Sequence, residues 1–132
     1  MGASGQCLCG AVSFFMEFPS KWVAHCHCTM CQRSNGAAFV TWVSIDDSQV
    51  RIDDSGTVLK WHSYTPEAQR GFCAQCGSSM FFRSEKWPGE IHITLANFIG
   101  PVDREPQIHA YYDTHVLWFS VNDELPKKPE QK

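Results

Sequence analysis

Cysteines in three groups are the residues of this chain best suited to chemistry. The 132 residues include seven cysteines, which form a Cys-x-Cys pair, a triplet and a Cys-x-x-Cys pair with none left over. Thiolates are preferred zinc ligands; a structural site takes four protein ligands, whereas a catalytic site takes three and keeps one position open. The seven cysteines therefore predict two zinc ions (Zn²⁺) per chain, one structural and one catalytic. In chain order, the groups are Cys7 and Cys9, then Cys26, Cys28 and Cys31, then Cys73 and Cys76.

The two outer pairs are the candidates for the closed, four-thiolate site. In the segment CAQCG, residues 73–77, both sulfurs can face one metal, and the glycine permits the positive φ that such a turn often needs. Cys7 and Cys9 flank a single residue, so an extended segment can place both sulfurs on one side. A metal held by all four thiolates would link the N-terminal region to the middle of the chain. It would contribute folding free energy only when bound.

The central triplet leaves three thiolates, from Cys26, Cys28 and Cys31, without an obvious fourth protein ligand. Three thiolates on Zn²⁺ give a centre with a formal charge of about −1, which is soft and electron-rich. Such a centre is poorly suited to generating hydroxide and well matched to another sulfur. We therefore expect the open position to take an exogenous thiol.

Three other interpretations of these cysteines remain open. His27 is a possible fourth ligand, although an extended segment from Cys26 to Cys28 points its side chain away from both flanking sulfurs. A Cys-x-x-Cys pair can be a redox dithiol, although the surrounding sequence lacks the βαβ pattern of that motif. Both zinc ions can also be structural, in a non-catalytic zinc-stabilised β scaffold that binds a protein partner. A fourth protein ligand at the triplet would favour the scaffold, and an open position would favour an enzyme.

The segments that must position these cysteines have the pattern of short β-strands. Stretches rich in Val, Ile, Phe and Trp alternate with turn sequences, and no amphipathic stretch of about 11 residues predicts a long helix. The predicted fold class is all-β, a small single domain with at most short helices. One short helix is expected from Thr29 to about Ser34, ended by Gly36. Strands are expected over residues 11–18, 22–26, 38–45, 50–52, 57–62, 79–83 and 91–96.

Composition and charge limit the domain organisation and the classes of partner. Residues 1–121 are predicted to form the domain, and residues 122–132, with two prolines and little apolar content, a flexible tail. A net charge of −3 without a block of Lys and Arg predicts no nucleic-acid binding. No apolar run reaches the roughly 18 residues of a membrane span. The N-terminal segment lacks a secretion signal, so a cytoplasmic location with reduced thiols is expected. These features leave the oligomeric state undefined.

Three segments of the sequence together resemble a known family. The segments GQCLCGAVSF, CHCTMCQRSNGAAF and RGFCAQCGSSMFF are similar to those of the glutathione-dependent formaldehyde-activating enzymes, a family that includes centromere protein V. The resemblance extends from about Gly5 to Trp118, and the three-part cysteine spacing is highly specific. It implies a β-tent fold with two zinc ions. In the family the outer pairs hold the structural zinc and the triplet holds the catalytic one, which agrees with the division made from spacing.

The resemblance also implies an activity and a set of site residues. The family's activity is the reversible condensation of formaldehyde with glutathione, a carbon–sulfur lyase reaction, so the expected partners are a glutathione-like thiol and a small aldehyde. By residue type and motif position, His27 and His109 are candidate proton donors, with a structural role as the alternative. Arg33 and Arg70 lie close to the cysteines in sequence and are candidates to bind substrate carboxylates. The chain departs from the family pattern at His115, where a lysine is expected.

Overall fold

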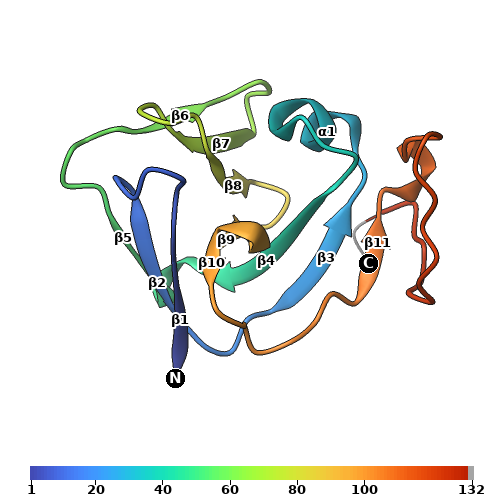
Figure 1. Ribbon diagram of the computed structural model, residues 1–132, viewed down its shortest axis with the longest axis horizontal. Coiled ribbons are helices and arrows are strands. Elements are labelled where there is room, and N and C mark those ends of the chain that lie inside the picture. The colour runs from blue at the N-terminus through green and yellow to red at the C-terminus, as the bar shows by residue number, and fades with distance from the viewer. Residues whose placement is uncertain (131–132) are drawn as a thin grey trace.

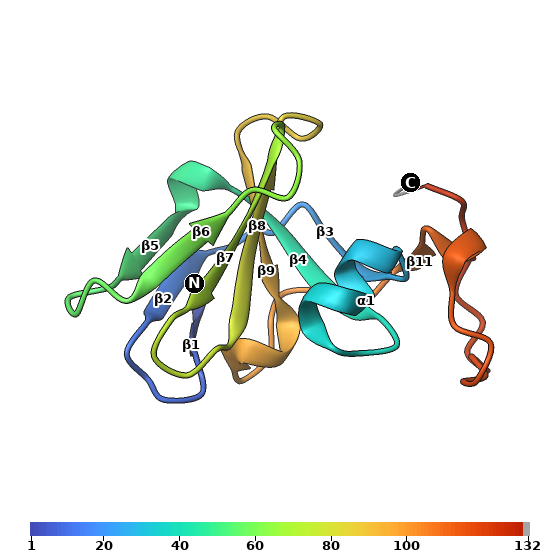
Figure 2. The same cartoon turned by 90° about the horizontal axis from the view of Figure 1, so that it is seen from above.

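Two β-sheets pack face to face around an apolar core in the computed structural model, which describes residues 1–130 (Figures 1 and 2). One sheet has four strands in the order β10-β1-β2-β5, and the other has seven in the order β11-β3-β4-β9-β8-β7-β6. Neighbouring strands are antiparallel except for β11, which runs parallel to β3. The strands are β1 (Gly2–Gln6), β2 (Ser13–Glu17), β3 (Trp22–Cys26), β4 (Val40–Asp46), β5 (Val50–Asp53), β6 (Leu59–His62), β7 (Ala68–Cys73), β8 (Ser79–Ser84), β9 (Glu90–Thr94), β10 (Phe98–Ile99) and β11 (Ile108–Ala110).

The seven-stranded sheet has two apolar faces with different partners. Successive residues of a strand point to opposite faces, so Val23 and Ala24 of β3 lie on different sides of the sheet. On the first face, Val23 and its cross-strand partner Val43 are buried in the core against the four-stranded sheet. On the second face, Ala24 and its partner Trp42 line a cavity that the other sheet does not cover. The core buries apolar side chains from both sheets, including Phe14, Met16, Val43, Ile45, Met80, Phe81, Ile91 and Ile93.

Residues 1–130 contain a single short α-helix, α1 (Thr29–Asn35), which joins β3 to β4. The side chain of Cys28 caps its N-terminus by accepting a hydrogen bond from the backbone N–H of Cys31. Gly36 ends the helix in the left-handed conformation, with φ of 60°. The prediction of an all-β domain with one short helix that stops at Gly36 is confirmed. No helix within residues 1–130 is both long enough and apolar enough to cross a bilayer.

The C-terminal segment, residues 122–130, lies along the outer edge of β11, where both views show it at the end of the molecule away from β5 (Figures 1 and 2). The backbone N–H of His109 donates to the carbonyl of Pro126, and the N–H of Lys128 donates to the carbonyl of His109. Tyr111 and Tyr112 donate in the same way to carbonyls of this segment. The segment expected from sequence to be a flexible tail makes these backbone hydrogen bonds up to residue 130, and its flexibility stays a prediction. Residues 131–132 of that expected tail lie outside the described residues.

Candidate metal centres

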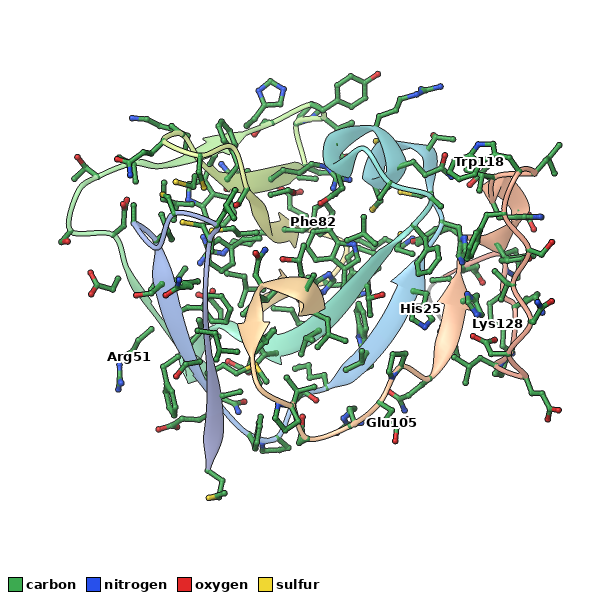
Figure 3. All side chains as sticks on the ribbon, in the orientation of Figure 1. His25, Arg51, Phe82, Glu105, Trp118 and Lys128 are labelled. Atoms are coloured by element: carbon green, nitrogen blue, oxygen red, sulfur yellow. The ribbon has the colours of Figure 1, made fainter. Side chains whose placement is uncertain are left out.

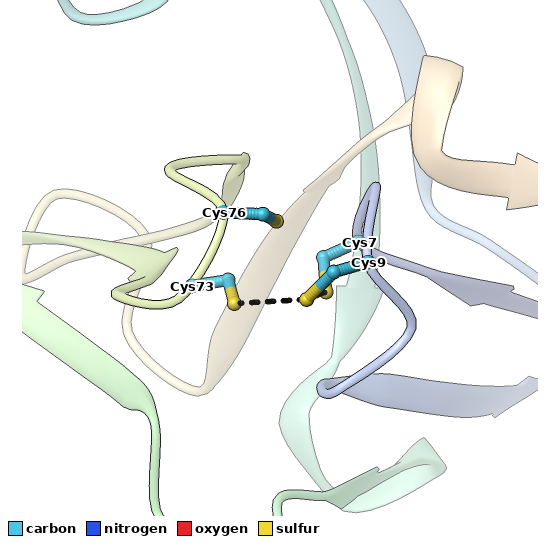
Figure 4. Close-up of side chains that lie close together, drawn as sticks. All are labelled: Cys7, Cys9, Cys73 and Cys76. Carbon is cyan, nitrogen blue, oxygen red and sulfur yellow. Dashed lines mark hydrogen bonds between the residues drawn. The ribbon is translucent and has the colours of Figure 1, made fainter.

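The four outer cysteines meet where two turns converge (Figure 4). Cys7 and Cys9 lie in the turn after β1, and Cys73 and Cys76 lie at the end of β7 and in the turn that follows. The Sγ atoms of Cys7 and Cys9 are 3.7 Å apart, and those of Cys9 and Cys73 are 3.8 Å apart. Tetrahedral zinc with Zn–S bonds near 2.3 Å requires sulfurs about 3.8 Å apart. The four-cysteine cluster therefore fits zinc in geometry as well as in ligand type.

Hydrogen bonds lower the pKa of Cys7 and Cys76, two of these four thiols. The backbone N–H of Val12 donates to Cys7 Sγ at 3.4 Å, and Gln75 Nε2 donates to Cys9 Sγ at 3.3 Å. Hydrogen bonding from Ser78 lowers the pKa of Cys76 to about 5, whereas burial raises the pKa of Cys73 to about 11. The Ser78 hydroxyl also accepts the backbone N–H of Leu8, so it connects the two turns. Such outer contacts orient metal ligands before a metal binds.

The three central cysteines form a second cluster at the junction of β3 and α1. Cys26 ends β3, Cys28 caps the helix, and Cys31 lies in its first turn, which brings the Sγ atoms of Cys26 and Cys31 to 3.3 Å. Hydrogen bonds from the Cys26 and Cys31 thiols lower the pKa of Cys28, while the same sharing with Cys28 raises that of Cys26. Closely packed thiols that share protons in this way fit a site for a divalent cation, which favours all three thiolates.

The three-cysteine cluster has fewer protein donors than a closed zinc site. Within residues 1–130, no fourth His, Cys, Asp or Glu atom joins the three sulfurs within 4.8 Å of each of them. The described part of the chain therefore offers three thiolates and leaves a tetrahedral ion one ligand short.

A cavity of about 330 Å³ adjoins the three-cysteine cluster on the second face of the seven-stranded sheet. All three cysteines line it, and much of the rest of its wall is aromatic. Phe82 of β8 projects from the middle of this wall (Figure 3). The aromatic residues are Trp22, Trp42, Tyr64, Phe82, Trp87 and Tyr111, and the polar or charged ones include His62, Glu67, Arg70, Lys86 and His92.

Two cations face this otherwise apolar cavity. The guanidinium of Arg70 lies over the Phe82 ring, 4.9 Å from its centroid, and its Nη2 is 3.7 Å from Cys31 Sγ. Lys86 Nζ donates a hydrogen bond to the Tyr111 hydroxyl at 2.7 Å. Of the two arginines predicted to meet a substrate, Arg70 lines the cavity, whereas Arg33 is exposed on α1 and does not.

The two histidines predicted as proton donors lie away from the cavity. His25 and Cys26 are consecutive in β3, so they face opposite sides of the sheet, and His109 pairs with His25 on the side away from the cavity. His27, just beyond the strand, turns to that same side, where its Nε2 is 2.8 Å from Nδ1 of His109. The structure thus brings His27 and His109 to each other but not to the central cysteine cluster. His115, the departure from the family pattern, stacks on Tyr112 with ring centroids 3.9 Å apart.

Lys86 and Tyr111 are cavity residues that the sequence did not single out. Lys86 lies in a loop after β8 and Tyr111 directly follows β11, so they are 25 residues apart in the chain. Neither residue belongs to a sequence motif that would have identified it. They meet only because the strands that precede them belong to the same folded sheet.

The sequence comparison assigns the chain to a family. Residues 2–114, which contain all seven cysteines, match the sequence model described as glutathione-dependent formaldehyde-activating enzyme. The chain belongs to this family. A Halomonas elongata protein named "Putative glutathione-dependent formaldehyde-activating enzyme" is 22% identical over 124 residues, covering 89% of this chain and 79% of that protein. The crystal structure of a Rhodobacter sphaeroides protein matches with a TM-score of 0.64 at 23% identity, covering 76% of this chain and 92% of that one, and it confirms the fold.

Proposed function

We propose that this chain is a zinc-dependent carbon–sulfur lyase that reversibly joins glutathione or a related thiol to formaldehyde or another small aldehyde. The observation that carries the proposal is the three-cysteine cluster, which lacks a fourth donor among residues 1–130 and opens onto a cavity. A fourth protein ligand at this cluster would favour the alternative, a non-catalytic zinc-stabilised scaffold that binds a protein partner. Family membership and the name of the Halomonas relative support the same reaction class.

The reaction forms one carbon–sulfur bond and moves one proton. The sulfur of the thiolate attacks the carbonyl carbon, the carbon–oxygen π bond opens to an alkoxide, and protonation of that oxygen gives the hemithioacetal. A zinc ion on the three thiolates would supply a position that favours ionisation of the incoming thiol. For a thiol of pKa near 8.5, full ionisation at pH 7 raises the thiolate fraction about thirtyfold, or roughly 2 kcal/mol. Part of this gain is lost because a stabilised thiolate is a weaker nucleophile.

Positioning by the cavity must therefore supply most of any acceleration. Holding two reactants in contact geometry can contribute up to about 7–11 kcal/mol. The aromatic wall around Phe82 excludes water, and Arg70, directed at the cysteine cluster, can bind a carboxylate of the thiol. The Tyr111 hydroxyl accepts from Lys86 Nζ and keeps its own hydrogen, so it is the proposed donor to the alkoxide oxygen.

The test follows exchange between free and thiol-bound ¹³C-formaldehyde by NMR, because the uncatalysed equilibrium forms the same product. The zinc-loaded protein should accelerate exchange with glutathione or with a smaller thiol. Cys28→Ser should reduce that acceleration at least about a hundredfold, since a metal ligand is lost. Serine is also a good N-cap, so α1 is retained in this variant. Exchange at the uncatalysed rate with every thiol and aldehyde tried would overturn the proposal.

A further inference from the structure

A third group of potential metal ligands lies on the face of the seven-stranded sheet opposite the cavity. His25 of β3, His109 of β11 and Asp123 of the C-terminal segment each offer one ligand atom, and these atoms all lie within 4.8 Å of one another. Figure 3 places His25 beside β11 and Lys128 on the C-terminal segment at the same end of the molecule. The family match over residues 2–114 includes the two histidines of this group but not Asp123.

The two imidazoles of this group are oriented from behind by hydrogen bonds. Nδ1 of His25 pairs with the Thr41 hydroxyl at 2.7 Å, which leaves Nε2 to face the group. Nδ1 of His109 pairs with Nε2 of His27 at 2.8 Å, while Nε2 of His109 meets both carboxylate oxygens of Asp123, at 2.9 and 3.0 Å. Metal-binding histidines characteristically use their second ring nitrogen in this way, because the hydrogen bond fixes the ring and its tautomer.

We propose that His25, His109 and Asp123 bind a divalent transition-metal ion of the zinc class, separate from the two cysteine clusters. Two imidazole nitrogens and one carboxylate oxygen are a common ligand set for zinc, with bonds of about 2.0–2.2 Å. Tetrahedral ligands at that length are about 3.3 Å apart, close to the present separation of His109 Nε2 from Asp123. The exposed segment that carries Asp123 allows the remaining adjustment.

Metal binding at this group requires a change of tautomer in the buried histidines and a small shift of Asp123. His109 gives up the hydrogen that Nε2 shares with Asp123 and holds one on Nδ1, directed at Nε2 of His27. His27 correspondingly carries its hydrogen on Nδ1, a buried atom with no hydrogen-bond partner among the described residues, and neither imidazole changes charge. Two neutral imidazoles and one carboxylate leave a divalent ion with a net charge of about +1, which water can complete on the exposed side.

A metal at this group would attach the C-terminal segment to the seven-stranded sheet through side chains. Backbone hydrogen bonds already join His109 to Pro126 and Lys128. A metal shared by His25, His109 and Asp123 would join β3, β11 and this segment through side chains as well. Binding should therefore protect the segment from proteolysis and raise the melting temperature, because only the folded chain presents the three ligands together.

The test uses the full chain with both cysteine clusters loaded with zinc and any affinity tag removed. Native mass spectrometry during titration with Zn²⁺ should show a third ion. Titration with Co²⁺ should add absorption of nitrogen- and oxygen-bound cobalt without new sulfur charge-transfer bands. Asp123→Asn should weaken the third site by more than about tenfold. Glu124→Gln, the adjacent acidic residue outside the group, is the matched control and should bind as the unaltered chain does.

A second variant separates ligand loss from displacement of the C-terminal segment. Thr41→Val removes only the hydrogen bond that orients His25, and it should weaken the third site by about tenfold while the segment stays in place. A wild-type protein that saturates at two ions would overturn the proposal. So would Asp123→Asn and Thr41→Val variants that both bind a third ion as tightly as the Glu124→Gln control.

Discussion

The two cysteine clusters share one ligand type but occupy different places in the fold. The four-cysteine cluster joins two turns that are more than sixty residues apart, and it packs against the main core, where Cys7 and Cys73 are buried. The three-cysteine cluster takes all its ligands from Cys26–Cys31, and it lies on the other face of the larger sheet beside a cavity. A metal bound by cysteines far apart in sequence would cross-link the fold. A metal bound by cysteines close together in sequence would not, so we expect the rest of the fold to depend less on it.

The surroundings of the two clusters differ as well. Ser78 bonds to Cys76 and to the backbone of Leu8, so each turn of the four-cysteine cluster supports the other. At the three-cysteine cluster the guanidinium of Arg70 lies 3.7 Å from Cys31 Sγ, and the neighbouring surface is an aromatic wall. Under the proposed function, thiolates serve stability at the four-cysteine cluster and reactivity at the three-cysteine cluster, where the adjoining sheet face presents a cavity.

The largest predicted effect comes from removing one ligand of each cluster. Cys73→Ser should leave the chain unfolded or strongly destabilised at 25 °C, because a structural zinc contributes roughly 10–16 kcal/mol and a typical domain has only about 5–15. Cys28→Ser should melt within a few degrees of the unaltered protein and lose the proposed activity. Thermal unfolding followed by circular dichroism, with zinc counted per chain, measures both. Equal losses of stability in the two variants would contradict the comparison.

A smaller effect is expected from the cavity arginine. Arg70→Met should raise KM for a carboxylate-bearing thiol roughly tenfold or more, because a charged hydrogen bond contributes about 1.5–3 kcal/mol. Arg33→Met removes the same charge from the exposed surface of α1 and should change KM less than about twofold. Steady-state exchange rates with thiols that carry or lack a carboxylate provide the measurement. Similar KM values for the two variants would remove Arg70 from substrate binding.

The smallest predicted effect compares the glycines beside the two clusters. Gly77 and Gly36 have φ of 83° and 60°, and an added Cβ would meet no atom within 4 Å at either position. Alanine at either site should therefore cost only the backbone strain, about 1–2 kcal/mol, which lowers the melting temperature by a few degrees. Gly77→Ala should loosen zinc at the four-cysteine cluster, and Gly36→Ala should lower activity because it ends the helix that carries Cys31. If Gly77→Ala lowered activity and Gly36→Ala loosened zinc at the four-cysteine cluster, the two clusters would not have the separate roles proposed.

The sequence was most informative where the determinants are local. Cysteine spacing predicted both clusters, and the Thr29 to Gly36 segment predicted the helix, because ligands or caps within a few residues need no tertiary information. Four strands were not predicted. β1 is rich in Gly, Ala and Ser and lacks the β-branched residues that favour strands, and β11 is three residues long and pairs with β3 across some eighty positions.

The wall of the cavity depends on register across many strands. Arg70 lies opposite Phe82, and Phe82 lies opposite His92, so three residues from three strands share one face. A shift of one residue in any of these pairings would send the side chain to the core. His27 and His109 illustrate the same point, since they were chosen by type and lie on the other side of the sheet. Residue type identifies such candidates, but the register of strand pairing determines which face of the sheet they occupy.

The position of residues 122–130 has a consequence for solubility. β11 ends the seven-stranded sheet, and an unpaired outer strand offers a row of N–H and C=O groups onto which another molecule can add a strand. In this chain the carbonyls of Pro126, Lys128 and Glu130 accept the N–H groups of His109, Tyr112 and Tyr111. Residues 122–130 thus pair with the outer edge of β11, which would otherwise be free to pair with a strand of another molecule. We expect this pairing to reduce aggregation through that edge.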